Sequence, residues 1–385
     1  MFPRPITPTT SPTATPYTRL NLVQPNVHKE WFMDKHRNER LRVATLSPLA
    51  EDLRQSIVES EPRIEFLNGN DLLPPMRYAA DYAGDPAFRR SAAQQAELDR
   101  ALAHADAVFG VPGQSPRELK TAVSAAPRAV WWHTTAAGGG GQVAAAALRP
   151  ADLARLTFTT SAGAHGTTLA EFTVFGLLAG AKTLPRLVHQ QQQHLWSDRW
   201  TMGHLSEQRV LVAGLGGIGR EVVRLLKAFG ATVVGLSRHD DVPAGVDEVV
   251  HPRELSATVG TVDAIAITLP GTATTVDMFN AEVFAKVRPG VTLVNVGRGT
   301  VVDEAALIAA LEDGRVGFAA LDVAAVEPLP ADSPLWAMPN VLISPHTAAL
   351  TDREEGRVAQ IFLDNARRLL DGRSLRNVVD TVEFY

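Results

Sequence analysis

The chain of 385 residues contains no cysteine. This absence excludes disulfide bonds, thiolate metal sites and a cysteine nucleophile, and it suits a reducing cytoplasm. The formal net charge is −5, so we expect no broad basic surface of the kind that binds nucleic acid. No apolar run reaches the roughly 20 residues that span a bilayer, and the first residues lack the basic-then-apolar layout of a secretory signal. We therefore expect a cytoplasmic protein without nucleic-acid, membrane or metal partners.

The length allows two or three domains, each with its own core. We divide the chain into an N-terminal tail (1–40), the first part of a substrate domain (41–160), a dinucleotide-binding domain (161–347) and a return to the substrate domain (348–385). The beginning of the tail is rich in proline and threonine, which cannot build a core. We expect it to be mobile, or to lie as an arm on a partner subunit.

Strands and helices alternate after the tail, which predicts an α/β fold with parallel sheets. In the first domain the predicted strands are 41–46, 64–67, 107–111, 130–133 and 157–160, and the predicted helices are 51–59 and 92–103. In the second domain about six strands are predicted, over 210–213, 232–236, 263–268, 293–296, 318–323 and 341–344. A helix over 352–370 closes the chain and is expected to return to the first domain.

A glycine-rich turn organises the second domain. Gly214, Gly216 and Gly219 lie between a buried strand and an amphipathic helix, and a second buried strand follows. This βαβ unit carries a dinucleotide-binding fingerprint: the first glycine permits a tight turn, the second lets the backbone approach a pyrophosphate, and the third lets the helix pack close to the strand. The helix N-terminus, with Gly217 and Ile218, presents free N–H groups and a positive dipole end to the phosphates.

The second strand of this unit ends in Ser237-Arg238-His239, where a site for NAD has an Asp or Glu that binds the ribose hydroxyls. A carboxylate would repel a 2′-phosphate, whereas an arginine and a hydroxyl would hold it. We therefore favour NADP(H). In the alternative, Arg238 stacks on the adenine or points to water, and Asp240 or Asp241 serves NAD(H).

Three ionisable residues follow predicted strand ends in the second domain: Arg298, Glu327 and His346. Open α/β sheets bind ligands at these ends. Each residue alone also suits an ordinary surface loop, but the three together suit the reduction of a 2-oxo acid. Arg298 can hold the substrate carboxylate, His346 can give a proton to the carbonyl oxygen, and Glu327 can pair with the imidazole. The hydride must come from a nicotinamide.

The sequence blocks around these residues resemble a known family, the D-isomer-specific 2-hydroxyacid dehydrogenases. The blocks are Asn295-Val-Gly-Arg298-Gly, Leu321-Asp322-Val323 with Glu327-Pro328-Leu329, and Ser344-Pro-His346, with weaker similarity at Ala164-His165, Leu169-Ala170-Glu171 and Asn377-Val-Val-Asp380. The resemblance covers residues 41–385. It implies two doubly wound domains, a Rossmann dinucleotide-binding domain inserted into a smaller flavodoxin-like substrate domain.

The resemblance also implies roles for single residues. Arg298 would anchor the substrate carboxylate, His346 would be the acid/base with Glu327 as its partner, and Asp322 would contact the nicotinamide amide. Further coenzyme contacts are expected from residues that end two other strands, Leu269, Pro270, Val296 and Gly297. The backbone of Ala137, Gly138 and Gly139 would bind the substrate carboxylate, with a merely flexible glycine turn at 138–141 as the alternative.

Two departures from the family pattern stand out. The loop at 138–141 is all glycine where the family usually ends it in Val-Asp or similar, which leaves the substrate contacts there open. Ala348-Ala349 stands where the family often has a glycine shortly after the histidine, which leaves the shape of that loop open.

The leading hypothesis for function is a reductase of a small 2-oxo acid of the glyoxylate or hydroxypyruvate type that forms the D-2-hydroxy acid. The alternative is a non-catalytic, nucleotide-sensing partner protein of the same fold, which the complete set of ionisable residues disfavours. Oxidation of formate is disfavoured because formate enzymes that resemble the family carry glutamine in place of the glutamate; phosphite is less clearly excluded. The apolar helix predicted from Leu169 to about Leu184 predicts a homodimer. Trp131, Trp132 and Trp336 could line the substrate pocket or belong to the core.

Overall fold

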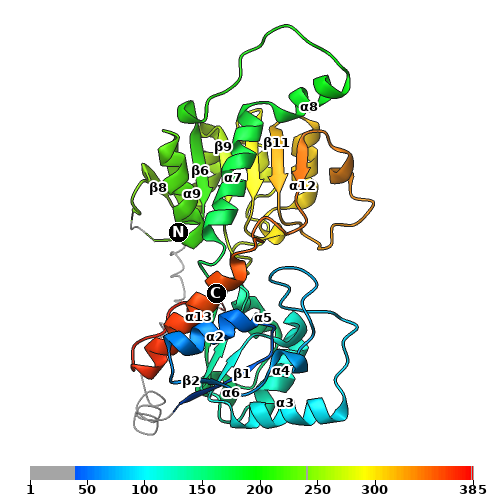
Figure 1. Cartoon of the computed structure of the whole chain (residues 1–385). Coiled ribbons are helices and arrows are strands. Elements are labelled where there is room, and N and C mark those ends of the chain that lie inside the picture. The colour runs from blue at the N-terminus through cyan, green and yellow to red at the C-terminus, as the bar shows by residue number, and fades with distance from the viewer. Residues whose placement is uncertain (1–39, 240–241, 383, 385) are drawn as a thin grey trace, which may run out of the picture.

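Two lobes, each built on a parallel β-sheet, make up the part of the molecule that the structure describes (Figure 1). The computed structural model describes residues 40–239, 242–382 and 384. The predicted tail over 1–40 therefore lies, apart from its last residue, outside the described residues, as do Asp240 and Asp241. Parallel strands alternating with helices confirm the predicted α/β class.

The first lobe contains a five-stranded sheet in the order β2-β1-β3-β4-β5, with every neighbouring pair parallel. The strands are β1 (Leu41–Thr45), β2 (Ile64–Phe66), β3 (Ala107–Phe109), β4 (Trp131–His133) and β5 (Thr157–Thr159). All five predicted strands are present, because short runs of buried apolar residues mark them. Their order is that of flavodoxin-like sheets.

The first lobe has more helices than the sequence predicted. They are α2 (Glu51–Ser60), α3 (Ala92–His104), α4 (Pro116–Ala125), α5 (Gly139–Ala145) and α6 (Pro150–Arg155). The prediction found α2 and α3 and missed the other three. The expectation of a glycine loop over 138–141 is wrong after Gly138, because the next three glycines form the first turn of α5. Glycine is a poor helix former, so this turn could not be recognised from the amino-acid pattern.

The second lobe contains a seven-stranded parallel sheet in the order β12-β11-β10-β9-β6-β7-β8. The strands are β6 (Arg209–Ala213), β7 (Thr232–Leu236), β8 (Glu248–Val250), β9 (Ala264–Ile267), β10 (Val291–Asn295), β11 (Val316–Leu321) and β12 (Val341–Ile343). Six match the prediction. The edge strand β8 was missed because three residues that begin with a glutamate show no clear pattern. In chain order the sheet reads 3-2-1-4-5-6-7, the Rossmann order with one added strand.

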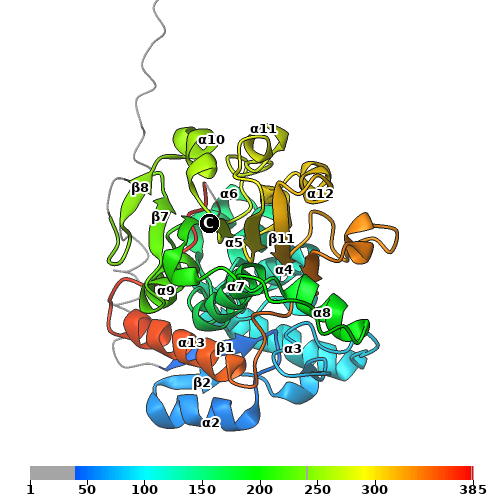
Figure 2. The same ribbon diagram turned by 90° about the horizontal axis from the view of Figure 1, so that it is seen from above.

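Helices cover both faces of this second sheet. Figure 2 shows α7 (Gly166–Ala181) and α9 (Gly217–Ala228) on one side of it, and three helices on the other. These three are α10 (Leu255–Thr258), α11 (Ala281–Phe284) and α12 (Glu304–Glu312). No described helix is long and apolar enough to cross a membrane.

The apolar helix α7 packs against the sheet of its own lobe. Its small residues face its own sheet, where a Cβ on Gly176 would lie 2.8 Å from Ala320 and a Cβ on Gly180 would collide with Thr292. The helix is not buried all round, because Phe175 is 49% exposed. α7 therefore covers the Rossmann sheet with its small residues and leaves an aromatic side chain outside.

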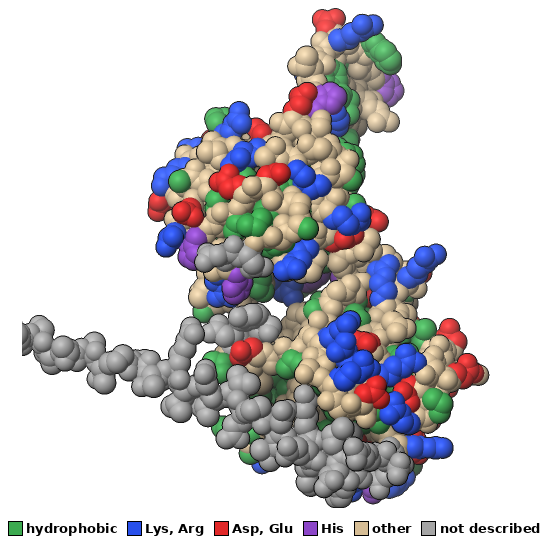
Figure 3. Space-filling model, turned by 90° about the vertical axis from the view of Figure 1, so that its left-hand side faces the viewer, with side chains coloured by type: hydrophobic (Ala, Val, Ile, Leu, Met, Phe, Trp, Pro, Cys, Tyr) green, Lys and Arg blue, Asp and Glu red, His purple; other side chains and the backbone are tan. Residues whose placement is uncertain are grey.

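Residues 182–204, which we call the arm, stand away from the rest of the second lobe (Figures 1 and 3). After α7 comes the left-handed residue Thr183 (φ +53°), which is the N-cap of a separate helix, α8 (Leu184–Gln192). No residue of α8 is buried. Beyond it Leu195 and Trp196 are exposed, the tryptophan completely. The arm thus presents apolar side chains without packing them.

The last helix, α13 (Glu354–Leu370), returns to the first lobe, as the sequence predicted. It lies along α2 (Figures 1 and 2). Its central Phe362 is fully buried and stacks on Trp131 with ring centroids 4.9 Å apart. The first lobe therefore has one core on each face of its sheet, and the C-terminal helix completes one of them.

The chain passes between the lobes twice, and a hydrogen-bonded pair joins the two passages. His165 at the start of α7 and Glu354 at the start of α13 are 2.8 Å apart between Nε2 and Oε1, with 12% and 3% of their side chains exposed. Beside them, the Arg357 guanidinium donates to the carbonyl oxygen of Ala164 (3.1 Å), and the Thr168 hydroxyl lies 3.2 Å from the carbonyl oxygen of Ala349.

We predict that His165→Ala lowers the free energy of unfolding by about 2–4 kcal/mol, because it leaves the buried carboxylate of Glu354 without its partner. Denaturant unfolding followed by circular dichroism measures the change. The control is Lys286→Ala, which removes an exposed pair with Glu282 and should cost less than about 1 kcal/mol. Equal effects of the two variants would contradict a role for the buried pair.

Candidate functional site

Each glycine of the turn after β6 has a distinct geometry. Gly214 is left-handed, with φ at +102°. A Cβ on Gly219 would collide with the carbonyl oxygen of Gly214, so a side chain there would push α9 away from β6. Nothing lies within 4 Å of the positions that Cβ atoms would take on Gly216 and Gly217. The turn is therefore crowded at Gly214 and Gly219 and open at Gly216 and Gly217. This shape would let a pyrophosphate lie against the backbone.

The first N–H groups of α9 point into this open turn and have no partner within the helix. Gly216 is the N-cap residue, and no side chain caps the helix. Ile218 packs partly buried against the core of the sheet. Thr268, which follows β9, donates from its hydroxyl to the carbonyl oxygen of Gly214 at 2.8 Å and ties the turn to the neighbouring strand. Thr268 was not recognised from the sequence, where a hydroxyl at the end of the adjacent strand is its only signal.

The residues expected at the coenzyme ribose follow β7. Ser237 is half-buried, and its hydroxyl accepts from the backbone N–H of His239 at 2.9 Å. The side chain of Arg238 is exposed. β7 is the direct neighbour of β6, so this serine and arginine lie at the carboxyl edge beside the glycine turn.

Four more predicted coenzyme residues follow the next two strands. Leu269 and Pro270 come after β9, and Val296 and Gly297 come after β10. The two loops touch, because a Cβ on Gly297 would lie 2.5 Å from the carbonyl oxygen of Leu269. Together with the glycine turn they form one continuous edge of loops.

The backbone on both sides of Arg298 is closely packed. A Cβ on Gly299 would collide with the backbone of the loop after β11. Asn295, buried at the end of β10, accepts from the N–H of Gly297 (3.0 Å) and donates to the carbonyl oxygen of Arg298 (3.1 Å). The two glycines thus allow close packing and do not mark a loose turn, while the arginine side chain itself is exposed. The role of Asn295 in holding this turn was not recognised from the sequence.

One residue of the first lobe lies directly against this arginine. A Cβ on Gly138 would collide with Nη2 of Arg298. Gly138 follows Ala137 and is the N-cap residue of α5, while Gly139 already belongs to the helix and packs against the Thr134 hydroxyl. The structure therefore brings the predicted glycine segment and the predicted arginine together, although they are 160 residues apart in the chain.

The predicted histidine and glutamate are directly hydrogen-bonded. Nδ1 of His346, in the loop after β12, lies 2.7 Å from Oε2 of Glu327, in the loop after β11. The side chains are 50% and 39% exposed, so water reaches both. Oε1 of Glu327 accepts from the N–H of Ala324 at 3.2 Å, which fixes the carboxylate. A carboxylate at Nδ1 keeps a proton on that nitrogen and leaves Nε2 for exchange with a ligand.

Asp322, the residue expected at the nicotinamide amide, directly follows β11 and is 2% exposed. Its backbone N–H donates to the carbonyl oxygen of Asn295 on β10 at 3.0 Å. Its carboxylate contacts the loop that carries His346, and the hydroxyl of Ser344 in that loop lies 2.6 Å away. The sequence analysis gave Ser344 no role of its own.

A second histidine near the carboxyl edge of the first sheet has the opposite character. His133, the last residue of β4, is completely buried between the hydroxyls of Thr159 (2.9 Å) and Ser161 (3.1 Å). Burial lowers its pKa to about 3, so the ring is neutral at neutral pH. It cannot exchange protons with a ligand as His346 can.

The tryptophans do not line the site. Trp131 and Trp132 are completely buried in the cores on the two faces of the first sheet. Trp336 is 53% exposed and lies in the 3₁₀ helix η7 (Pro334–Ala337), before β12 begins. The interpretation as core residues holds for the first two.

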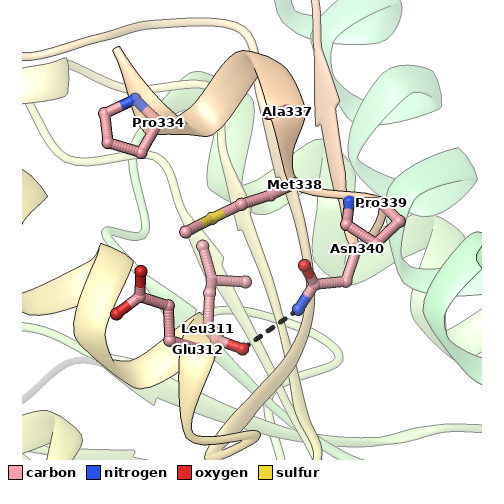
Figure 4. A pocket seen from close by; sticks show the side chains of 7 residues that line it. All are labelled: Leu311, Glu312, Pro334, Ala337, Met338, Pro339 and Asn340. Atoms are coloured by element: carbon pink, nitrogen blue, oxygen red, sulfur yellow. Dashed lines mark hydrogen bonds between the residues drawn. The ribbon is translucent and has the colours of Figure 1, made fainter.

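A hollow of about 550 Å³ lies between the end of α12 and η7 (Figure 4). The Asn340 side chain donates to the carbonyl oxygen of Leu311 there at 3.3 Å. Asn340 precedes β12, so the hollow is at the amino edge of the sheet, opposite to His346. Glu312 is the one ionisable residue that lines it. The lining therefore does not supply the pair of ionisable groups that acid–base catalysis would need. No group of three or more His, Cys, Asp or Glu side chains in the described residues could hold a metal ion.

Comparison with known proteins shows which family the chain is similar to. Residues 174–348 match the model of the NAD-binding domain of D-isomer-specific 2-hydroxyacid dehydrogenases. Glyoxylate/hydroxypyruvate reductase B of Yersinia enterocolitica is 34% identical over 218 residues, which are 55% of this chain and 67% of the relative. (S)-Sulfolactate dehydrogenase of Chromohalobacter salexigens is 33% identical over 59% of this chain and 74% of its own. D-3-Phosphoglycerate dehydrogenase of Mycobacterium tuberculosis, 33% identical over 55% of this chain, matches over only 40% of its own length.

Solved structures match over nearly their whole length. A D-isomer-specific 2-hydroxyacid dehydrogenase of Xanthobacter autotrophicus, in complex with NADPH and MES, has a TM-score of 0.73 and 28% identity and covers 90% of this chain and 100% of its own. An NADPH-dependent glyoxylate/hydroxypyruvate reductase of Sinorhizobium meliloti, in complex with NADP and sulfate, has a TM-score of 0.70 and 26% identity over 89% and 99%. The sequence motifs, the two sheets and these matches agree, and the chain belongs to the family of D-isomer-specific 2-hydroxyacid dehydrogenases.

Proposed function

We propose that this protein reduces a small 2-oxo acid to the D-2-hydroxy acid with a nicotinamide coenzyme, and that glyoxylate or hydroxypyruvate is the favoured kind of substrate. The observation that carries the proposal is the hydrogen bond between His346 and Glu327 at the same sheet edge as Arg298. An imidazole with its carboxylate partner and a nearby guanidinium are the groups that this reduction needs from the protein.

In this proposal Arg298 binds the substrate carboxylate. The backbone around Gly138, which lies against the guanidinium, forms the rest of the carboxylate-binding site. His346 gives the proton on Nε2 to the carbonyl oxygen, and Glu327 orients the ring through Nδ1. The charged imidazole also favours the negative charge that develops on that oxygen. In the reverse direction the neutral ring accepts the proton of the hydroxyl. A bound nicotinamide coenzyme supplies or takes the hydride.

The glycine turn, with Gly214, Gly216 and Gly219, would hold the coenzyme pyrophosphate, and Asp322 would face its nicotinamide amide. We favour NADP(H) over NAD(H) because Arg238 and Ser237 could bind a 2′-phosphate. The two solved relatives with NADPH or NADP support this preference. The alternative carboxylates for NAD(H), Asp240 and Asp241, lie outside the described residues.

The choice of substrate rests on the relatives. One relative is named a glyoxylate/hydroxypyruvate reductase, and another is named a sulfolactate dehydrogenase. These names have in common a small 2-oxo or 2-hydroxy acid, and the Arg298 guanidinium suits the carboxylate of such an acid. A non-catalytic, nucleotide-sensing partner protein is the second candidate, and the intact hydrogen bond between His346 and Glu327 argues against it.

We also propose a homodimer in the cytoplasm. The arm exposes Leu195 and Trp196, and α7 exposes Phe175. Exposed apolar side chains on a projecting segment are typical of an interface between copies of a chain. For the domains we retain the boundaries 41–160, 161–347 and 348–385, with residues 1–40 as a tail.

The first prediction from the proposed function concerns catalysis. His346→Ala should lower kcat by about 10²–10⁴-fold, because the substrate oxygen then lacks its proton donor. NADPH oxidation against a panel of 2-oxo acids, read at 340 nm, measures it. The matched control is His104→Ala, at an exposed histidine at the end of α3, which should leave kcat unchanged. A normal kcat for His346→Ala would remove the histidine from its role. Tight coenzyme binding without turnover of any 2-oxo acid by the unaltered protein would favour the nucleotide-sensing alternative.

The second prediction concerns the coenzyme. Arg238→Ala should raise the KM for NADPH by about 10-fold or more, since a charge-assisted hydrogen bond to the 2′-phosphate is lost, and should change the KM for NADH little. Steady-state kinetics with both coenzymes decide the matter. A preference of the unaltered protein for NADH would contradict the assignment.

The third prediction concerns assembly. The double variant Leu195→Asp/Trp196→Asp should be monomeric, because charged groups cannot be buried unpaired in an interface. Light scattering after gel filtration should give a mass near 41.4 kDa for this variant and twice that mass for the unaltered chain. Gln192→Ala, at the end of α8, is the control that should stay dimeric. A dimer that tolerates both charges would place the interface elsewhere.

A further inference from the structure

The backbone of His346 has an unusual conformation. Its φ is +54°, in the left-handed region that residues with a side chain rarely adopt. Its N–H donates to the carbonyl oxygens of Ser344 (2.9 Å) and Asp322 (3.0 Å). A conformation of this kind persists only where the surrounding structure imposes it. The question is which group holds the loop in this shape.

The carboxylate of Asp322 is that group. Its Oδ1 accepts three hydrogen bonds, from the hydroxyl of Ser344 (2.6 Å), the N–H of Thr347 (3.0 Å) and the N–H of Ala348 (3.0 Å). One donor precedes His346 and two follow it. Asp322 is 2% exposed and directly follows β11, a strand paired on both sides, so it is a rigid point of attachment.

The other carboxylate oxygen is used differently. Oδ2 of Asp322 makes no hydrogen bond within the described part of the chain, although the residue is buried. Oδ2 is not one of the fully buried atoms, so a group from outside the protein can reach it and donate a hydrogen bond to it. The proposed function offers such a donor, the amide of a bound nicotinamide.

We propose that Asp322 and Ser344 are positioning residues for His346: Oδ1 of Asp322 holds the left-handed loop in place, while Oδ2 stays available for the coenzyme amide that the proposed function already assigns to it. This inference rests on the proposed function of the site. The Asp322 side chain then contacts both the coenzyme-binding site and the loop of the proton donor His346. The loop is held in place before substrate binds. The Ser344 hydroxyl is the one side-chain donor to Oδ1; the other two donors are backbone groups that no substitution removes.

The two residues should therefore affect different kinetic constants. Ser344→Ala removes one donor and loosens the loop without touching Oδ2, so kcat should fall about 10-fold while the KM for NADPH stays within about 2-fold. Ser344→Thr restores the hydroxyl and should restore kcat. Asp322→Asn keeps an acceptor oxygen for the loop but turns Oδ2 into an N–H₂ donor, so it should mainly raise the KM for NADPH. Substitution of a residue that merely stabilised the fold would not lower kcat in one variant and raise the KM for NADPH in the other.

A measurement without substrate or coenzyme tests the loop directly. Amide hydrogen exchange of Thr347 and Ala348, followed by mass spectrometry of peptides over 344–350, should be at least about 10-fold faster in Ser344→Ala than in the unaltered protein. Ser344→Thr should return to the slow rate. Ser124→Ala, at an exposed serine on α4, is the matched control and should change nothing.

These experiments separate the inference from the proposed function. Unchanged exchange at Thr347 and Ala348 in Ser344→Ala would overturn the positioning role, whatever the enzyme turns over. Faster exchange in a protein that reduces no 2-oxo acid would keep the loop contact and reject the proposed function. If Ser344→Ala lowers kcat and Ser344→Thr does not, both stand; if both variants lower kcat equally, the hydroxyl is not the positioning group.

Discussion

The relation between the two lobes is the constraint on which the site depends. Gly138 of the first lobe lies against Arg298, because its missing side chain leaves room for the guanidinium. That contact requires the lobes to be held at a fixed distance, and both passages of the chain between them contribute. The buried pair of His165 and Glu354 joins the start of α7 to the start of α13. Each of these helices packs into the core of a different lobe, so the pair acts on two rigid bodies.

Much of this architecture could be predicted from the sequence because the strands of parallel sheets have a simple sequence pattern. Their central strands are buried on both faces and read as short apolar runs. Residues after such runs all reach one edge of the sheet, which is why Arg298, Glu327 and His346 could be grouped although up to 48 positions separate them. The glycines of the turn were predictable for a similar reason, since each tight contact excludes a side chain.

What could not be predicted depends on contacts without a sequence pattern. The edge strand β8 pairs on one side only and carries a glutamate, and α5 begins in three glycines that disfavour a helix. The bond between Ser344 and Asp322 joins residues 22 positions apart and leaves no periodicity. The shape of the loop with Ala348 and Ala349, where the family often has a glycine, was left open by the sequence; in the structure the left-handed residue of this loop is His346 itself. The sequence cannot say which residue of a loop carries the positive φ.

Exposure decides which histidine can do chemistry. His133 and His346 both lie at the carboxyl end of a parallel strand, and each has oxygen partners within 3.1 Å. The ring of His133 is buried away from water. Burial lowers its pKa to about 3, so at neutral pH the ring is uncharged and lacks the acidic second proton. His346 is half exposed, and its partner is a carboxylate instead of two hydroxyls. A proton donor needs both a route to solvent and a neighbour that tolerates its positive charge. The loop after β12 gives His346 both: half of its side chain is exposed, and its Nδ1 lies 2.7 Å from Oε2 of Glu327.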